Sequence, residues 1–426
     1  MGESLKGTLQ AGVGKCNITP PAYYLAAGGF EEDLIREIKE EFWVQAMVLS
    51  VGDEKLAIVS CDLTLISNEL IDEMRSLILE WTGIPREATI ISATHVHGAP
   101  VTFPSCAGEP DEAYLKLLVR KVATAVLTAC QNLRPAKLGA SSGYEDSVAF
   151  NRRLRFPDGT VRMNFSLTKN RAYPEATPLG PIDPELSVLR VDDVSGRPIG
   201  ALINYACHNI PNFASLIGTY MGRILDCPDF MGIFLPGACG NVNYINHLEP
   251  NQGTSAQELF RISRILACEA ARTHQRIVTS TIDDVEYTKI ILEIPERGFT
   301  KADEVPGKAQ EEVFIKERKK VREKGIDTIH QVEVMATRLG NSIGIVSNPG
   351  QLFAEHGLEI KSKSPFEKTF VLCLTNGNCG YVPTRESFDE GGYEPLRTSH
   401  SSFLSVDAGE RIVDTSVALL KEIYRD

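Results

Sequence analysis

The sequence predicts an α/β fold in which mixed central β-sheets are flanked by helices, built as one large domain spanning residues 1–426. Short apolar runs of strand length alternate along the chain with long amphipathic stretches of helical period. No internal repeat, low-complexity tract or linker interrupts this alternation. The hydrophobic fraction is 43% and the charged fraction is 23%, which is typical of a globular protein with a substantial core.

The first predicted elements are a hairpin and a helix. Apolar runs at 44–51 and 55–62 are joined by Gly52-Asp53-Glu54, a segment typical of a tight turn between strands. The apolar period over Asn68–Thr82 predicts a helix, because Ser67 can cap its start and Gly83 can end it. A strand at 88–94 and a helix at 110–132 are expected next.

The rest of the chain continues this alternation. Apolar runs bounded by turn residues predict strands at 186–191, 199–207, 231–235, 331–338, 342–347 and 369–374. A helical apolar period predicts helices at 255–273, 308–324, 351–361 and 407–423. The segment 308–324 is heavily charged, so we expect it to form a solvated outer face.

Five of the predicted strands lead into a polar segment rich in glycine or proline. In open α/β sheets, ligands bind at the carboxyl ends of the strands. The five segments therefore predict a single site to which all of them contribute. They are Thr94-His95-Val96-His97-Gly98, Cys207-His208-Asn209, Pro236-Gly237-Ala238-Cys239-Gly240-Asn241, Asn348-Pro349-Gly350-Gln351 and Thr375-Asn376-Gly377-Asn378-Cys379-Gly380-Tyr381.

Histidines at two of these strand ends are candidates for metal binding. In an extended segment, residues two apart point to the same side, so His95 and His97 can both face a pocket. Imidazole nitrogen is a good ligand for zinc, and His208 follows another apolar strand in the same way. The alternatives are satisfied loop histidines at 95 and 97 and a core histidine at 208. His356, on the helix predicted after Gln351, is a further group that could approach the site.

One segment matches the pattern of a serine-hydrolase nucleophile. Gly139-Ala140-Ser141-Ser142-Gly143 fits Gly-x-Ser-x-Gly, which needs a strand before it and a helix directly after it. The residues that follow, around 148–150, read instead as a strand. A serine esterase that uses Ser141 is therefore the minor alternative, and the segment is expected to be a small-residue turn.

Composition limits the partners and the compartment. The net charge of −12 argues against non-specific binding to nucleic acid or to anionic membranes, since both need a positive face. No apolar stretch reaches the length of a membrane span, and the first residues do not resemble a signal peptide. The scattered cysteines include no Cys-x-x-Cys pair, which favours reduced thiols. We expect a cytoplasmic protein with a small-molecule substrate, and homo-oligomerisation is compatible with these features.

Seven motifs, in their order along the chain, resemble the neutral/alkaline ceramidase family, zinc amidases that hydrolyse the N-acyl bond of ceramide. The opening run Ala11-Gly12-Val13-Gly14-Lys15-Cys16-Asn17-Ile18-Thr19-Pro20 is similar to the family's Gly-x-x-Asp-Ile-Thr-Pro. The resemblance implies the mixed α/β architecture of that family's catalytic domain. The other segments that carry it are 94–98, Asn151-Arg152, 204–209, 237–246, Asn348-Pro349-Gly350-Gln351 and 381–394.

The resemblance also implies roles for individual residues. The implied ligands of a single zinc ion (Zn²⁺) are His95, His208 and Tyr381, with the fourth position falling on Gln351. The residues implied to contact the substrate or the reacting centre are His97, Arg152, Tyr393 and Asn243.

Three departures from the family pattern bear on function. The family's zinc-binding glutamate is replaced by Gln351, a weak neutral ligand. The alternatives are Glu355 or His356 as the substitute ligand, or another divalent ion as the metal. The family's active-site serine is replaced by Asn243. We also expect no counterpart of the C-terminal β domain and signal peptide of secreted ceramidases. A smaller, more polar amide or ester is therefore expected as the substrate in place of ceramide.

Together these features predict a metal-dependent hydrolase that cleaves a C–N amide bond of a small or N-acyl substrate. Metal-activated water would attack the carbonyl, and Tyr393 or Arg152 would stabilise the oxyanion. His97 would act as general acid to the leaving nitrogen. The alternative from another class is a non-hydrolytic protein that uses the same pocket to bind a ligand.

Overall fold

The larger of two main β-sheets runs through the whole molecule. The computed structural model describes residues 8–29, 31–38, 40–104, 108–210, 212–252, 256–304, 311–325, 327–398 and 401–425. Eight strands form the larger sheet in the order β12-β11-β10-β5-β1-β2-β3-β4. Its outermost pairs, β11 with β12 and β3 with β4, are parallel, and the pairs between them are antiparallel. The strands are β1 (Gln10–Asn17), β2 (Trp43–Val51), β3 (Glu54–Cys61), β4 (Thr89–Ala93), β5 (Arg134–Tyr144), β10 (Glu185–Asp193), β11 (Pro198–Tyr205) and β12 (Met231–Pro236).

A second sheet of four strands packs against the first. Its order is β14 (Val285–Pro295), β15 (Ile329–Leu339), β16 (Ile343–Ser347) and β18 (Lys368–Leu372). Alternation along β2 shows how the sheets stack, because Met47 and Leu49 pack toward Ile345 and Phe370 of the second sheet. Ala46, one residue away, belongs to the core under the helices. The interior is thus a sandwich of two sheets, confirming the predicted mixed α/β class.

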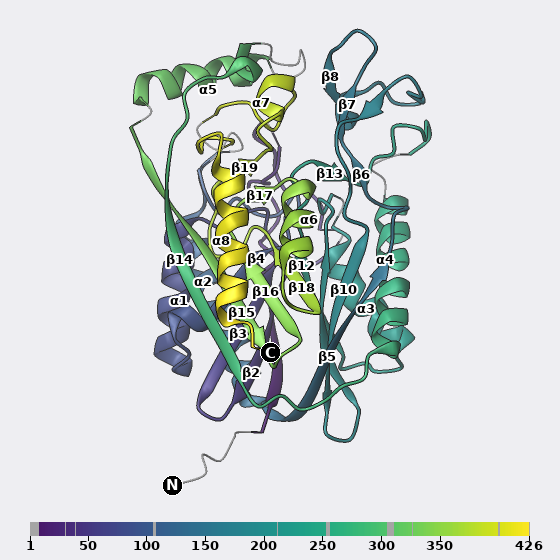
Figure 1. The fold of residues 1–426 in the computed structure, drawn as a ribbon, viewed down its shortest axis with the longest axis vertical. Helices are drawn as coiled ribbons and strands as arrows, with labels where there is room; N and C mark the ends of the chain where they lie inside the picture. The colour runs from purple at the N-terminus through teal and green to yellow at the C-terminus, as the bar shows by residue number, and fades with distance from the viewer. Residues whose placement is uncertain are drawn as a thin grey trace.

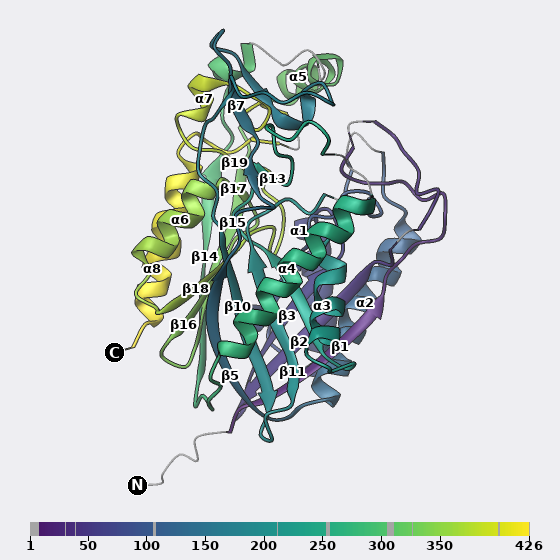
Figure 2. The ribbon, with the colours of Figure 1, turned by 90° about the vertical axis from the view of Figure 1, so that its right-hand side faces the viewer.

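Helices cover both outer faces of this sandwich, as Figure 2 shows from the side. The face of the larger sheet carries four helices, and the face of the smaller sheet carries two. The first four are α1 (Asn68–Thr82), α2 (Glu112–Gln131), α3 (Ala214–Ile224) and α4 (Ala256–Arg276), and the last two are α6 (Ala354–Lys363) and α8 (Ala408–Ile423). The charged helix α5 (Glu311–Lys324) and the short α7 (Ser387–Glu390) lie at one end of the molecule (Figure 1).

Local signals in the sequence set the boundaries of α1. The side chain of Ser67 accepts a hydrogen bond from the N–H of Leu70, and Gly83 ends the helix with φ of 73°. These are the residues from which the helix was predicted, and the bounds agree. None of the helices in the described part of the chain has the length and apolar composition that a bilayer crossing requires.

Two local expectations are wrong. The segment containing Ser141 is not a turn, because it lies within β5 and pairs with β10, where Ser141 faces Val188. Gln351 was expected at the start of a helix, but it lies in the short strand β17 (Gln351–Leu352), and α6 begins only at Ala354. In both places pairing with a distant strand decides the backbone conformation, and local sequence does not report it.

The strand ends form one end of the sandwich. Short strands lie there, with β17 pairing in parallel with β19 (Tyr381–Val382) and β6 (Phe150–Asn151) pairing with β13 (Val242–Asn243). Figure 1 shows these short pairs above the carboxyl ends of the main strands. The three-stranded ribbon β7 (Arg153–Arg155), β8 (Val161–Met163) and β9 (Thr177–Pro178) projects beyond them. The polar segments that follow the strands are therefore held by backbone pairing rather than left as free loops.

Candidate functional site

His95 is the first residue of the candidate site and follows β4 directly. Its backbone takes the left-handed conformation, with φ of 61°, which turns the side chain away from the strand direction. The ring Nδ1 lies 2.8 Å from the carbonyl oxygen of Thr64, so Nδ1 carries the proton and donates it there. The other nitrogen, Nε2, is buried and has no hydrogen-bond partner in the described part of the chain. The ring thus offers one free lone pair to the interior.

His208 follows β11 and has the same arrangement. Its Nδ1 lies 2.7 Å from the carbonyl oxygen of Cys239, and this hydrogen bond leaves Nε2 as the acceptor nitrogen. Nε2 faces the hydroxyl of Tyr381 at 3.5 Å, and the two rings stack with an interplanar angle of 11°. The rings of His95 and His208 are 4.6 Å apart between centroids. The structure therefore brings together the two predicted metal ligands, which are 113 positions apart in the sequence.

His97 completes a group of three histidine rings. Its centroid lies 5.1 Å from that of His95 and 6.4 Å from that of His208. The ring packs against Gly28, where a Cβ atom would lie 2.6 Å from Nδ1, so only glycine leaves room for the ring. A hydrogen bond to the backbone of Gly28 orients it, and Nε2 is buried without a partner in the described residues.

All three imidazoles are held in the neutral form. Burial lowers the pKa of His95 to about 4, with a smaller opposing contribution from the hydrogen bond to Thr64. Burial also lowers the pKa of His97 and of His208 well below the usual value, assisted by the positive charge of Arg152. A neutral imidazole with its Nδ1 proton fixed is the form of histidine that binds a metal ion.

Gln351 lies beside Tyr381, whose ring stacks on that of His208. They are direct partners in the parallel pair of β17 and β19, so their side chains point to the same side. Gly240 packs closely on the backbone of Gln351, because a Cβ atom at position 240 would lie 2.4 Å from the carbonyl oxygen of Gln351. The side-chain oxygen Oε1 of Gln351 is buried and has no partner among the described residues. An unpaired buried amide oxygen is costly, and a cation is one group that would satisfy it.

Arg152 links Tyr381 to the rest of the site. Its Nη2 donates to the hydroxyl of Tyr381 at 3.0 Å, and its Nε donates to Glu394 at 2.6 Å. The guanidinium carbon lies 5.4 to 5.9 Å from three aromatic ring centres, those of Phe165, Tyr381 and Tyr393. A cation enclosed in this way is held in one orientation by both charge and ring faces.

Glu394 is a functional candidate that sequence reasoning missed. It is fully buried, binds Arg152 through Oε1, and lies 3.8 Å from Nε of Arg153 through Oε2. The sequence offered one signal, since Glu394 belongs to the Tyr393-Glu394 pair that carries part of the family resemblance. Its partner is 242 positions away, so the ion pair itself could not be predicted from spacing.

The phenols of Tyr381 and Tyr393 are neutral donors. Burial raises the pKa of both hydroxyls, and the guanidinium of Arg152 opposes the shift in each case. The two rings meet edge to face at 5.6 Å, and their hydroxyls share a hydrogen bond. Tyr393 and His97 are partly exposed, whereas His95 and His208 are buried. A substrate would therefore meet His97 and Tyr393 first.

Asn243 is close to the site but its polar atoms are engaged. Its amide forms two hydrogen bonds with the amide of Asn164, at 2.8 and 2.9 Å, one in each direction. Its Oδ1 also accepts the N–H of Ile245. This arrangement fits a residue that holds the loop in place, and a contact of Asn243 with substrate stays a prediction.

The two residues considered as substitutes for Gln351 are engaged elsewhere. Glu355 accepts a hydrogen bond from the amide of Asn241 at 2.9 Å. The ring of His356 lies 3.3 Å from the carbonyl oxygen of Pro383 and packs against Gly409. Among the described residues, no group of three or more His, Cys, Asp or Glu side chains is arranged to hold a metal ion. A metal at this site would therefore need the amide of Gln351 or the phenol of Tyr381 as ligands.

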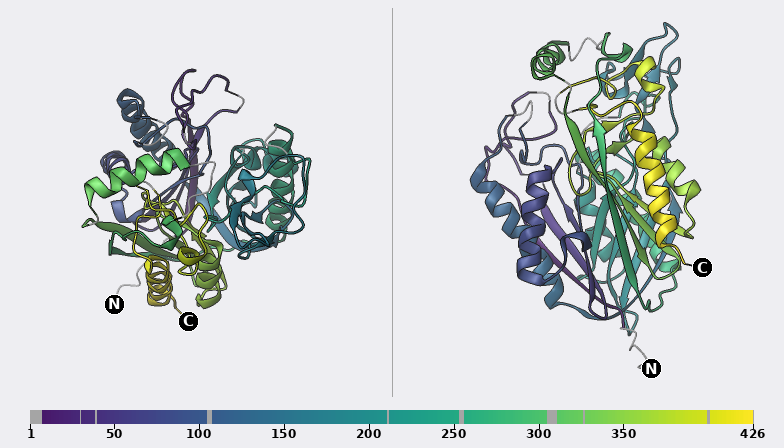
Figure 3. Two further views of the ribbon diagram at one scale, coloured as in Figure 1. Left: turned by 90° about the horizontal axis from the view of Figure 1, so that it is seen from above. Right: turned by 60° about the vertical axis from the view of Figure 1, so that its left-hand side comes forward.

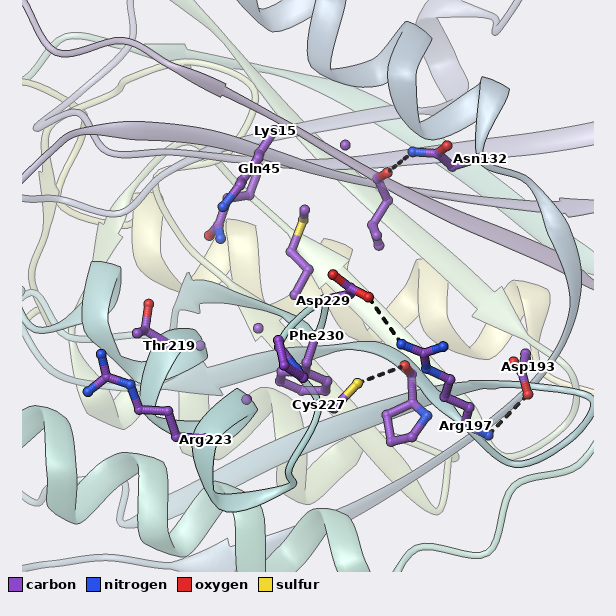
Figure 4. A pocket seen from close by; sticks show the side chains of 18 of the residues that line it. Lys15, Gln45, Asn132, Asp193, Arg197, Thr219, Arg223, Cys227, Asp229 and Phe230 are labelled. Carbon is purple, nitrogen blue, oxygen red and sulfur yellow. Dashed lines mark hydrogen bonds and ion pairs between the residues drawn. The ribbon is translucent and has the colours of Figure 1, made fainter.

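A large cavity lies away from the histidines. Its volume is about 1110 Å³, and Figure 4 shows the residues that line it, among them Lys15, Arg197, Arg223 and Asp229. It opens at the amino ends of β11 and β12, whereas His208 follows the carboxyl end of β11. Positive and negative side chains mix along its wall, and Arg197 is already paired with Asp229 at 3.1 Å. The cavity is thus separate from the candidate site.

Comparison with known proteins identifies the fold. Neither family models nor curated proteins match the sequence. Among solved structures, the neutral ceramidase from Pseudomonas aeruginosa superposes with a TM-score of 0.72 over 99% of this chain and 76% of that chain, at 17% sequence identity. A structure of a ceramidase complexed with C2 matches with the same values. The chain therefore has the fold of neutral ceramidase, as the motif resemblance implied.

Proposed function

We propose that the chain is a metal-dependent hydrolase that cleaves the C–N bond of a small or N-acyl amide. The observation that carries this proposal is the pair of neutral imidazoles of His95 and His208, 4.6 Å apart between ring centres. Each has its Nδ1 committed to a backbone carbonyl, and the Nε2 of His95 has no partner among the described residues. A buried acceptor nitrogen without a donor, such as Nε2 of His95, is unfavourable, and a metal ion is one group that would satisfy it.

The donor set fits one zinc ion. His95 and His208 would hold it through Nε2, Gln351 through Oε1, and Tyr381 through its hydroxyl oxygen, a set of nitrogen and oxygen ligands that zinc accepts. The hydrogen bonds to Thr64 and Cys239 are the outer contacts that orient such ligands. Zinc bound there would supply Lewis acidity and would lower the pKa of a bound water toward about 7.

The remaining residues act on the substrate. Tyr393 donates its phenolic proton toward the carbonyl oxygen, where negative charge develops during attack. Arg152 contributes its fixed positive charge to the same region through Tyr381 and Tyr393. The neutral Nε2 of His97 takes up a proton released on attack and delivers it to the leaving nitrogen. The fold shared with neutral ceramidase supports amide cleavage as the reaction.

Metal content tests the proposal directly. Elemental analysis of the purified protein should find about one zinc per chain. His95→Ala and His208→Ala should each remove most of that zinc, and a chelator should abolish hydrolysis of short N-acyl compounds. His247→Ala is the matched control, because His247 lies outside the histidine group beside the backbone of Ala176. Full turnover by metal-free protein would contradict the proposal.

A second candidate is a ligand-binding protein without hydrolytic activity. Two observations favour this function. Gln351, a neutral amide, stands where the family has a metal-binding carboxylate. Asn243 stands where the family has its active-site serine, and its amide is bound to Asn164. A metal-free pocket that binds a small amide without turnover would support this function instead. Metal analysis combined with calorimetric binding of a non-hydrolysed amide distinguishes the two.

A further inference from the structure

A small cavity lies between two loops beside the candidate site. Residues 164–173 form one side of it and residues 244–252 form the other. Its volume of about 250 Å³ is below the range of about 300–1,000 Å³ that encloses a whole drug-sized ligand. Seen from above, the teal part of the chain that contains both loops lies beside the yellow part that follows β19 (Figure 3). The small cavity therefore has room for one arm of a ligand rather than for a whole one.

Phe165 belongs both to the small cavity and to the surroundings of the candidate site. Its side chain lines the small cavity, and its ring meets that of Tyr393 edge to face at 5.9 Å between centroids. The guanidinium carbon of Arg152 lies 5.6 Å from the centre of the same ring. Phe165 and Tyr393 are both partly exposed, so a ligand can touch both rings. An arm of a substrate that is bound at Tyr393 can therefore extend over Phe165 into the small cavity.

Aromatic and aliphatic side chains form most of the lining. They are Phe165, Leu167, Tyr173, Tyr244, Ile245 and Pro250. An apolar cavity of about 150 Å³ is enough to bind benzene, so the small cavity has room for one aromatic ring and the carbon atom that links it to a carbonyl group. Aromatic rings pack edge to face or offset against one another, and three rings of the lining offer such contacts.

Charge does not select the occupant. Lys169, Arg171 and Glu249 line the small cavity, but all three are exposed and their charges are of both signs. Arg171 is already paired with Glu175 at 2.7 Å. Exposed charges contribute little binding energy, so a neutral group suits the small cavity best.

One buried polar group of the lining has no partner. Tyr244 is 1% exposed, and its hydroxyl makes no hydrogen bond within the described part of the chain. A buried polar group without a partner is costly. Because Tyr244 lines the small cavity, a hydroxyl group on an enclosed ring would supply the missing hydrogen bond.

We propose that the small cavity binds the acyl arm of the substrate, and that this arm carries one hydroxylated aromatic ring, as in a p-hydroxyphenylacetyl amide. The ring would pack against Phe165 and Tyr173, and its hydroxyl would meet that of Tyr244. This inference rests on the proposed amide hydrolysis, and it names the class of amide that the site cleaves.

The arrangement of the site places the acyl side of the amide next to the small cavity. In the proposed reaction Tyr393 donates to the carbonyl oxygen, and Tyr393 is the residue in ring contact with Phe165. His97 serves the leaving nitrogen, and its ring packs against Gly28 and the other two histidines instead. The amine part of the substrate is therefore expected to point away from the small cavity.

A series of amides of one amine, which differ only in the acyl group, tests the substrate class. The zinc-loaded protein is assayed with the N-acetyl, N-palmitoyl, N-phenylacetyl and N-(p-hydroxyphenyl)acetyl compounds. We expect kcat/KM to be about tenfold or more higher for the phenylacetyl compound than for the acetyl and palmitoyl compounds, because one ring fills the small cavity. The hydroxylated compound should gain about another tenfold, because it gives Tyr244 its partner.

Filling the small cavity tests where this preference arises. Thr168 lines the small cavity and is exposed, so Thr168→Trp adds a ring there from the outside. It should lower kcat/KM for the two ring compounds about tenfold more than for the acetyl compound. Thr177→Trp is the matched control, an exposed threonine of β9 that is not part of the lining, and it should leave the whole series unchanged. Melting temperatures check that both variants are folded.

Tyr244→Phe tests the hydrogen bond to the substrate ring. Phenylalanine keeps the aromatic ring of the lining and removes the hydroxyl. The ratio of kcat/KM between the hydroxylated and the plain phenylacetyl compounds should fall from about ten in the wild type to about one in the variant.

Binding of a ketone keeps this inference separable from the proposed function. p-Hydroxyphenylacetone has the ring and the carbonyl group but no C–N bond, and calorimetry measures its affinity. If the ketone binds, if Thr168→Trp weakens it about tenfold or more and if no amide is turned over, the proposed function fails and the ring site stands. Turnover of all four amides with equal kcat/KM would overturn this inference alone.

Three further results would overturn the inference. One is a loss of kcat/KM in Thr168→Trp that is equal for all four amides. Another is a preference for the hydroxylated ring that Tyr244→Phe retains. The third is the absence of both turnover and ketone binding, which would also remove the proposed function.

Discussion

Arg152 and Glu394 form an ion pair in the interior, with 2.6 Å between Nε and Oε1. Arg152 is 3% exposed and Glu394 is 0% exposed, so neither charge has access to solvent. The pair orients the guanidinium so that its other nitrogen, Nη2, meets the hydroxyl of Tyr381. Glu394 thus holds Arg152, and Arg152 in turn holds the hydroxyl of Tyr381.

Removing the charge of Glu394 should therefore affect both stability and turnover. Glu394→Gln leaves Arg152 buried without its counter-charge, and breaking such a pair typically costs about 3–5 kcal/mol. We expect kcat to fall by about 10²-fold, because the donor group near the carbonyl loses its orientation. Urea unfolding and steady-state kinetics measure the two effects. Glu390→Gln is the control, since Glu390 is 22% exposed and binds Arg153 and Arg155, and its loss should leave kcat within about threefold.

An unchanged kcat for Glu394→Gln in a folded protein would contradict the positioning role. Rescue offers a further check, because Glu394→Asp keeps the charge and shortens the side chain by one methylene. It should recover most of the stability and less of the turnover, since the ion pair survives while its geometry shifts.

Gln351→Glu should strengthen zinc binding. The unpartnered Oε1 of Gln351 would become one oxygen of a carboxylate, and an anionic ligand binds Zn²⁺ more tightly than a neutral amide. We expect the dissociation constant to fall about tenfold or more, measured by competition with a chelating dye. Gln351→Leu is the matched control and should weaken zinc binding. Equal affinities for the three proteins would show that residue 351 is not a ligand.

Gly28→Ala should disturb His97 without removing the metal. A Cβ atom at Gly28 would lie 2.6 Å from the His97 ring, and the φ of 94° there also disfavours alanine. Turnover should fall about 10²-fold through misplacement of a general acid–base group, while zinc content stays the same. Gly29→Ala is the control, because the nearest atom to its Cβ would be 3.5 Å away. Similar activity of the two variants would contradict the role of His97.

His274 should make the protein less stable in mild acid. Burial, assisted by the charge of Arg190, lowers the pKa of this histidine in the folded state to about 4. In the unfolded chain, His274 binds a proton from about pH 6.5 downward. The stability that the folded state gains from neutral His274 is therefore complete above pH 6.5 and is lost as the pH falls toward 4. The loss amounts to about 3 kcal/mol.

The variant His274→Phe isolates this contribution. Phenylalanine keeps the edge-to-face contact that His274 makes with Phe230 and cannot take up a proton. The free energy of unfolding, measured in urea at several pH values, should therefore fall less steeply between pH 6.5 and 4 for the variant than for the wild type. Parallel curves for the two proteins would contradict the assignment.

The sequence was sufficient to predict elements whose signals are local. The caps at Ser67 and Gly83 fixed α1, and apolar runs ending in polar residues located the strand ends that carry His95 and His208. The strand β5 was missed because its sequence, Arg134–Tyr144, is rich in small and polar residues. Its conformation comes from nine residue pairs with β10, which override weak local preference.

The site was predictable at the level of residue identity and less so at the level of contacts. Histidines at strand ends could be found by pattern, and the family resemblance added Tyr381, Tyr393 and Arg152. The carboxylate of Glu394 and the amide pair of Asn164 with Asn243 depend on packing between segments far apart in the chain. Such pairs leave no periodic trace in a single sequence.

Anomalous diffraction at the zinc edge, from crystals of zinc-loaded protein, tests the central claim most directly. We predict a single strong peak at about 2.0–2.1 Å from Nε2 of His95 and from Nε2 of His208. A zinc-loaded protein with no peak between these two nitrogens, or with zinc bound at another place only, would contradict it.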